Sequence, residues 1–158
     1  MRQLCKSTHL LLSVFISIVL FFPCIHSTHA AERTSIVIKR AEHTLYYKEN
    51  GRTVKTFPIT TGQKSTPTPA GTFTIVYKER NRPFYKKQIA GGAPNNPLGT
   101  RWLGLNIGGT KGNTYGIHGT NQAGTIGLKI SDGCIRMKNA DAEWLYDRVD
   151  TGTPVIIE

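Results

Sequence analysis

Short runs of alternating apolar and polar residues dominate the chain after residue 33, and they predict β-strands. Most of these runs are rich in β-branched or aromatic residues, and Gly, Pro or Asn separates them. The runs are TSIVIK (34–39), TLYYK (44–48), RTVKTFPIT (52–60), GTFTIVYK (71–78) and PVIIE (154–158). The turn signal at Glu49–Gly51 predicts a hairpin, so we expect an antiparallel meander.

A single segment has the period of an α-helix. Asn139 is expected to cap its start, and Gly152 and Pro154 are expected to stop it. The apolar positions at i, i+3, i+4 and i+7 are Ala142, Leu145, Tyr146 and Val149. The predicted fold class is therefore mainly β, an antiparallel, β-sandwich-like domain with one α-helix in its C-terminal region.

The segment Glu79–Thr100 shows neither period. It contains three prolines and several glycines, and it carries the basic residues Arg80, Arg82, Lys86 and Lys87. Irregular segments of this length in small domains are often lids or binding loops.

The first 30 residues read as a secretory signal peptide, which makes residues 31–158 the mature domain. Arg2 and Lys6 precede an apolar run of 13 residues, Leu10–Phe22, and small residues surround a cleavage point near Ala30. A membrane span needs about 20 apolar residues, so we expect no stable span after cleavage. The protein is then expected to be secreted and extracytoplasmic; the alternative, an uncleaved tether, would still leave the domain outside the cell.

Cleavage would also remove two of the three cysteines. Cys5 and Cys24 lie in the leader, so Cys134 would have no intramolecular partner and a disulfide scaffold is excluded. A lone thiol in an oxidising compartment is buried, pairs between chains, or is used in chemistry.

The chain has a formal net charge of +10, and removal of Arg2 and Lys6 with the leader would leave +8. Outside a cell this charge favours an anionic cell wall as partner, and we expect no nucleic acid partner.

The surroundings of Cys134 favour a reactive thiol. In an extended CIRM (134–137), Ile135 would face the core, and Cys134 and Arg136 would share the other face. The same alternation in TYGIHGT (114–120) turns His118 outward from the core. We therefore expect Cys134 and His118 to meet in a groove.

Thiol catalysis requires such a pair. A nearby imidazole accepts the proton of the thiol and later protonates a leaving amine. Gly133 would allow a substrate carbonyl to approach the backbone, whose N–H groups could receive an oxyanion. One Cys and two His after the leader match no structural zinc pattern, and we expect no metal and no cofactor.

The stretch GIHGTNQAGTIGLKISDGCIRMKNAD (116–141) resembles the signature of the L,D-transpeptidase catalytic domain, the YkuD-type family of bacterial cell-wall enzymes. STPTPAGTFTI (65–75) and GTPVIIE (152–158) are similar to other segments of that family, so the likeness covers nearly all of residues 31–158. Asp132 departs from the polar or basic residue expected before Gly133. A carboxylate there could raise the pKa of the thiol, unless it points to water or pairs with Lys129 or Arg136.

The resemblance implies a role for each site residue. Cys134 would be the nucleophile and His118 its base, with the Gly119 carbonyl holding the imidazole tautomer. Ser131 and Gly133 would shape the turn and the oxyanion hole. Arg136 would orient the substrate, for example through a peptide carboxylate.

The implied reaction concerns peptidoglycan and cell-wall organisation. Cys134 would attack the third residue of a donor stem tetrapeptide, release the terminal D-alanine, and pass the acyl group to an acceptor amine. A 3→3 cross-link results, and a carbapenem would be a covalent inhibitor. The alternatives are an L,D-carboxypeptidase that uses water as acceptor, and a non-catalytic basic wall-binding module.

Overall fold

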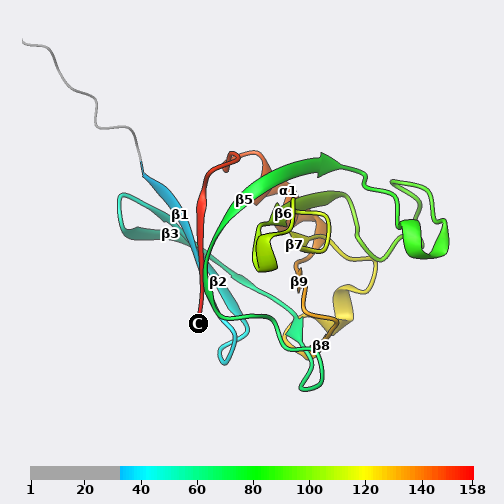
Figure 1. Cartoon of the computed structure of the whole chain (residues 1–158), viewed down its shortest axis with the longest axis horizontal. Helices are drawn as coiled ribbons and strands as arrows, with labels where there is room; N and C mark the ends of the chain where they lie inside the picture. Colours follow the sequence, from blue (N-terminus) through cyan, green and yellow to red (C-terminus); the bar gives the residue numbers. More distant parts are fainter. Residues whose placement is uncertain (1–32) are drawn as a thin grey trace, which may run out of the picture. The chain divides into compact units, whose positions relative to one another are not determined.

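The computed structural model describes residues 33–158, which contain ten strands and one α-helix (Figure 1). The strands are β1 (Thr34–Lys39), β2 (Thr44–Glu49), β3 (Arg52–Pro58), β4 (Thr61–Gly62), β5 (Gly71–Arg80), β6 (Arg101–Leu105), β7 (Tyr115–His118), β8 (Lys129–Ser131), β9 (Ile135–Arg136) and β10 (Pro154–Ile157). The helices are α1 (Asn139–Tyr146) and the 3₁₀ turns η1 (Tyr85–Lys87), η2 (Ile107–Gly109) and η3 (Ala123–Thr125). The predicted mainly β fold with one α-helix is confirmed, whereas the predicted leader lies outside the described residues.

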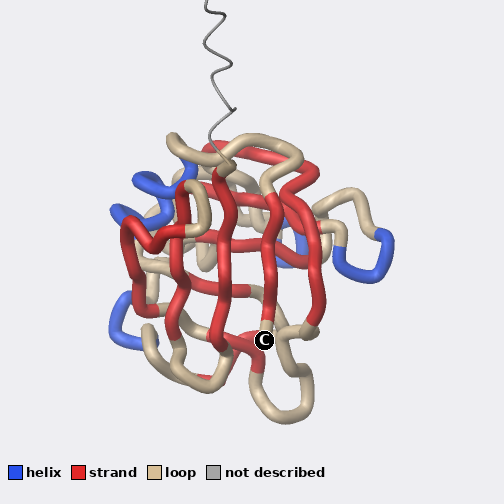
Figure 2. The backbone as a smooth tube through the Cα atoms, turned by 90° about the vertical axis from the view of Figure 1, so that its left-hand side faces the viewer, coloured by secondary structure: helices blue, strands red, loops and turns tan. Residues whose placement is uncertain are grey.

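Eight strands form one sheet in the order β3-β2-β1-β10-β5-β6-β7-β9, and β4 and β8 form a small second sheet. The large sheet curls on itself, so that strands at the front of Figure 2 run across those behind. Apolar side chains from both parts fill the space inside. The largest fully buried ones include Phe57, Ile36, Leu45, Ile75, Leu103, Leu105, Ile117, Ile135, Met137 and Leu145.

Most strand pairs are antiparallel, as expected, but three are parallel. β1 lies parallel to β10, with Ile36 opposite Val155, and the other parallel pairs are β7 with β9 and β4 with β8. Parallel neighbours require long crossovers, and the turn signals that predict a meander report only on adjacent hairpins. The antiparallel expectation therefore missed these pairings.

The helix α1 packs against β6 and β7, the part of the sheet that leads to the site. Its buried residues are Ala142 and Leu145, while Val149 is buried just beyond the helix end. The expectation that Asn139 caps the helix is wrong. The capping position is Lys138, and the Asn139 side chain instead bonds to backbone groups of other segments.

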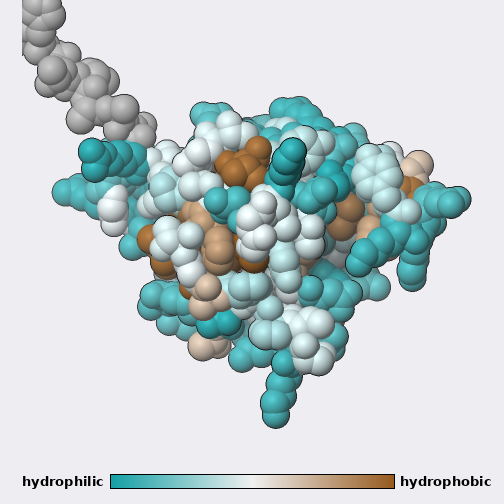
Figure 3. Space-filling model, in the orientation of Figure 1, coloured by the Kyte–Doolittle hydropathy of each residue, from teal (hydrophilic) through white to brown (hydrophobic). Residues whose placement is uncertain are grey.

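The face of the domain drawn in Figure 3 is largely hydrophilic, with apolar side chains in small separate patches. Within residues 33–158 no helix has the length and apolar character to cross a membrane.

Candidate active site

Two neighbouring strands bring the predicted reactive residues together. β7 and β9 pair in parallel, with Ile117 opposite Ile135 and His118 opposite Arg136. Both isoleucines are buried in the core, so His118 and Arg136 face the other side. Cys134 immediately precedes β9, and it lines the same pocket as His118 and Arg136.

This pocket has a volume of about 320 Å³. One wall comes from the irregular loop between β5 and β6, the segment for which a role as a lid or binding loop is predicted. The residues that line the pocket are Arg82, Pro83, Phe84, Tyr85, Lys86, Pro97, Leu98, Trp102, Asn113, Thr114, Tyr115, His118, Ser131, Asp132, Cys134 and Arg136.

His118 is buried, with an exposed fraction of 3%, and the expectation that it faces outward is wrong in this respect. The alternation predicted its face correctly, but the Trp102 ring stacks on the imidazole with centroids 5.4 Å apart and planes 19° apart. A short strand pattern reports the direction of a side chain and says nothing of what covers it.

The tautomer of His118 is fixed by its neighbour. Nδ1 lies 2.6 Å from the Gly119 carbonyl oxygen, which can only accept, so Nδ1 carries the proton and Nε2 is left as the basic nitrogen. Burial lowers the pKa of His118 from 6.5 to about 4, and the charge of Arg136 adds to this shift. Backbone hydrogen bonds to Gly119 and, to a smaller extent, to Leu98 oppose it. The imidazole is therefore neutral at pH 7.

The thiol of Cys134 is also neutral at pH 7. Burial raises its pKa above the ordinary value of 9.0, while a backbone hydrogen bond from Gly116 and the charge of Arg136 lower it. Asp132 raises the pKa of the thiol and Lys86 lowers it, both by smaller amounts. Sγ lies 3.6 Å from the Thr114 carbonyl oxygen, a contact in which a protonated thiol donates.

The turn before Cys134 is held by Ser131. Its Oγ donates to the Cys134 carbonyl oxygen over 2.6 Å and accepts from the Gly133 N–H over 3.2 Å. Gly133 has a φ of +104°, and a Cβ there would lie 2.9 Å from the Tyr115 ring. Only glycine fits this turn, and the Gly133 N–H is already used within it.

Charged side chains of both signs line the pocket that contains the thiol. Arg136, Arg82 and Lys86 supply positive charge, and Asp132 supplies one negative charge. Among the ion pairs of residues 33–158, none joins Asp132 to Lys129 or Arg136. The carboxylate is therefore part of the pocket wall, and its effect on the thiol has the direction expected.

Sequence reasoning missed the aromatic setting of Arg82. Its guanidinium pairs with Glu79 over 2.7 Å and lies over the rings of Tyr77, Tyr85 and Trp102 at 5.0–5.6 Å. The basic character of this loop was visible in the sequence, but the partners come from several elements. Of the four basic residues noted there, Arg82 and Lys86 line the pocket, whereas Arg80 bonds to Asp147.

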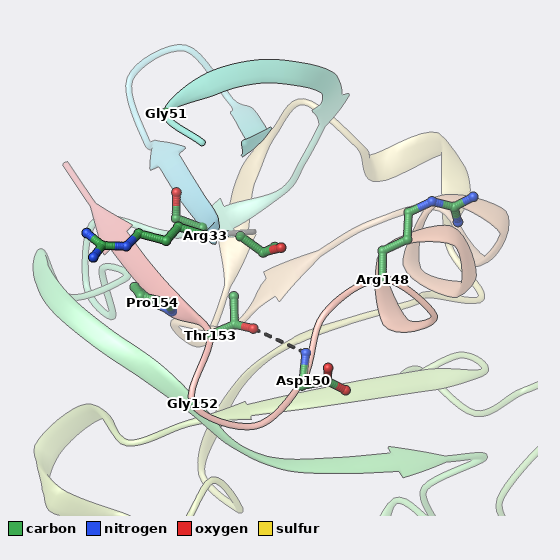
Figure 4. Close-up of a pocket in the computed structure, with 9 residues that line it drawn as sticks. Arg33, Gly51, Arg148, Asp150, Gly152, Thr153 and Pro154 are labelled. Atoms are coloured by element: carbon green, nitrogen blue, oxygen red, sulfur yellow. Dashed lines mark hydrogen bonds between the residues drawn. The ribbon is translucent and has the colours of Figure 1, made fainter. Parts of the chain in front are cut away.

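A separate hollow, drawn in Figure 4, lies against the start of β1 and the segment before β10. Arg33, Arg148 and Asp150 line it, and the Asp150 N–H donates to Thr153 Oγ1 over 3.1 Å. It contains no Cys or His. Nowhere in residues 33–158 do three His, Cys, Asp or Glu side chains lie close enough to hold a metal ion.

Comparison with known proteins agrees with the resemblance seen in the sequence. A profile of the YkuD L,D-transpeptidase catalytic domain matches residues 33–157. YqjB of Bacillus subtilis, whose name assigns it to the L,D-transpeptidases, is 37% identical over 147 residues, which cover 93% of this chain and 83% of YqjB. ErfK/SrfK of Escherichia coli, named for the same activity, is 35% identical over 142 residues, which cover 79% of this chain and 44% of that protein.

Solved structures show the same fold. An L,D-transpeptidase from Mycobacterium smegmatis matches with a TM-score of 0.65 and 26% identity, covering 80% of this chain and 59% of that one. L,D-transpeptidase 3 from Mycobacterium tuberculosis, solved with a faropenem-derived adduct, matches with a TM-score of 0.63 and 23% identity, covering 80% of this chain and 60% of that one. The chain thus spans about three fifths of these two solved chains.

Proposed function

Because this chain belongs to the L,D-transpeptidase family, we propose that it forms 3→3 peptidoglycan cross-links through an acyl-enzyme on Cys134. The observation that carries the proposal is the placement of Cys134 and His118 in one pocket, with the proton of His118 on Nδ1. With that proton on Nδ1, Nε2 is the unprotonated nitrogen that can act as a general base for the thiol.

The first half-reaction begins from the neutral pair. Nε2 of His118 takes the thiol proton while Sγ attacks the carbonyl carbon of the third residue of a stem tetrapeptide. The tetrahedral intermediate collapses, the bond to the terminal D-alanine breaks, and the imidazolium returns its proton to the departing amine. The product is a thioester on Cys134.

The second half-reaction repeats these steps with an amine of a neighbouring stem. The amine attacks the thioester and gives a proton to Nε2, and the thiolate of Cys134 leaves and is reprotonated. Because the pKa of the thiol is raised and that of His118 is lowered, proton transfer accompanies attack and no ion pair forms beforehand.

The charge of the pocket suits stem peptides. Arg136 and Lys86 offer positive groups to the carboxylates of the donor, and Asp132 offers a negative group to an ammonium of the acceptor. The signal-peptide pattern of residues 1–30 supports export, and the excess of basic over acidic residues in the rest of the chain suits an anionic cell wall.

The acyl-enzyme is tested with a carbapenem, whose strained ring presents an acyl group to a nucleophile. The faropenem-derived adduct with which L,D-transpeptidase 3 from Mycobacterium tuberculosis was solved motivates this choice. We expect the intact protein to gain the mass of the drug at Cys134, and we expect His118→Ala to slow this gain at least about tenfold. An adduct elsewhere, or an equal rate without His118, would contradict the mechanism.

A further inference from the structure

We propose that Asn139 is a positioning residue that holds His118 in its reactive tautomer and orientation. It acts through the peptide group between Gly119 and Thr120. The catalytic consequence rests on the function proposed above, whereas the effect on the imidazole does not.

The amide of Asn139 binds two backbone groups outside its own helix. Oδ1 accepts the N–H of Thr120 over 3.1 Å and the N–H of Thr100 over 3.4 Å. Thr120 follows β7 and Thr100 precedes β6, so one side chain at the start of α1 ties together the two loops that flank the imidazole.

The bond to Thr120 bears directly on His118. The Thr120 N–H and the Gly119 carbonyl belong to the same planar peptide group, so fixing one end fixes the direction of the other. The carbonyl end bonds to Nδ1 of His118 over 2.6 Å. A continuous chain therefore runs from the Asn139 amide through this peptide to the imidazole, and bonds in such a chain strengthen one another.

The surrounding backbone leaves room for this amide. A Cβ at Gly119 would lie 2.2 Å from Asn139 Oδ1, and a Cβ at Gly99 would lie 2.1 Å from it. Neither position could carry a side chain with Asn139 in place. At Gly99 a Cβ would also meet the Gly119 and Thr120 backbone at 2.6 Å, whereas at Gly119 the Asn139 oxygen is the one atom closer than 3 Å. The absence of a side chain at Gly119 therefore makes room for this oxygen.

Removing the acceptor has a specific consequence. Asn139→Ala leaves the Thr120 N–H without its partner, so the peptide can turn and the Gly119 carbonyl no longer favours the proton on Nδ1. We expect carbapenem acylation of Cys134 to slow about 10- to 100-fold, the scale of misplacing a reactive group. Asn139→Asp keeps an acceptor oxygen at the same position and should stay within about threefold of the parent protein.

The direct test is the ¹⁵N NMR spectrum of the histidine ring, which distinguishes the two tautomers without any turnover. His118 signals are assigned by their loss in His118→Asn. The parent protein and Asn139→Asp should show the proton on Nδ1, whereas Asn139→Ala should show a mixture of tautomers. If Asn139→Ala does not fold, Asn139→Ser takes its place in the test. The serine oxygen lies one bond nearer the backbone than Oδ1 of Asn139, so this variant should also show a mixture of tautomers.

Asn106→Ala is the matched control. Its Oδ1 accepts one backbone N–H, from Thr74 over 2.9 Å, and it does not line the pocket. This variant should lose stability and keep the tautomer and the acylation rate of the parent protein. If Asn139→Ala and Asn139→Ser also keep both, Asn139 is merely structural and the proposal is wrong. If the parent protein is not acylated but the tautomer shifts as described, the proposed function fails and the positioning role stands.

Discussion

The buried imidazole of His118 should make the stability of the protein depend on pH. Its pKa lies near 4 in the folded chain and near 6.5 in the unfolded chain. Between these values the unfolded state binds more protons, so the free energy of unfolding falls as the pH falls. The contribution of neutral His118 to the free energy of unfolding is fully present above pH 6.5 and is lost progressively towards pH 4.

The size of the effect follows from the two pKa values. At about 1.4 kcal/mol for each pH unit, the interval from 6.5 to about 4 amounts to about 3 kcal/mol. The side chain is only 3% exposed, so solvent screening reduces this figure little. This loss is a large share of the free energy of unfolding of a small domain, which is typically about 5–15 kcal/mol.

The assay is urea unfolding of the parent protein and of His118→Asn at several pH values between 7 and 4. Carboxylates titrate in both proteins, so the difference between the curves isolates His118. We expect the parent protein to lose about 3 kcal/mol more than His118→Asn over this range. His43→Asn, which removes the other described histidine, should keep this extra loss. Parallel curves for the parent protein and His118→Asn would refute the burial argument.

Three further predictions concern the thiol and its turn. Asp132→Asn should lower the pKa of Cys134 and speed its alkylation by iodoacetamide at pH 7 by about two- to threefold, since the carboxylate is exposed; an unchanged pH profile would contradict this. Arg136→Gln should act in the opposite direction, and alkylation that is not slowed would show that its charge does not reach the thiol. Gly133→Ala should destabilise the fold by about 1–3 kcal/mol and slow acylation, because φ is +104° and the Tyr115 ring is close. Gly152→Ala is the control, because Gly152 also has a positive φ, +92°, but open space around it, so this variant should lose stability and keep the acylation rate. Equal acylation rates in the two variants would show that the turn at Gly133 does not contribute to acylation.

The alternation of apolar residues was sufficient to predict the strands now labelled β1, β2, β3, β5 and β10. The spacing of apolar residues at i, i+3, i+4 and i+7 was sufficient to predict the helix α1. It could not predict that Ile36 lies beside Val155, because such a pairing depends on the closure of the whole sheet. Local turn signals carry no information about partners more than 100 residues apart. The pair β1 with β10 was missed for this reason, and the pairs β7 with β9 and β4 with β8 were missed because they also join strands that are not consecutive in the chain.

The same distinction separates what could and could not be predicted of the site. The faces of Cys134 and His118 followed from strand alternation, and the register of β7 with β9 places them in one pocket. The depth of His118 did not follow, because Trp102 stacks on it from β6. Asn139 was mistaken for a helix cap, since an asparagine at a helix start is a common cap and its partners, Thr100 and Thr120, are distant in sequence.

The central claim is that Cys134 transfers a stem-peptide acyl group to an amine. It is tested most directly by mass spectrometry of muropeptides after incubation of tetrapeptide-bearing fragments with the purified protein. We predict loss of one D-alanine and formation of a dimer joined between the third residues of two stems, and neither product with Cys134→Ala. If tripeptide is the only product, the enzyme hydrolyses the thioester with water and does not form cross-links. Cross-linked dimer formed equally by Cys134→Ala would contradict the claim.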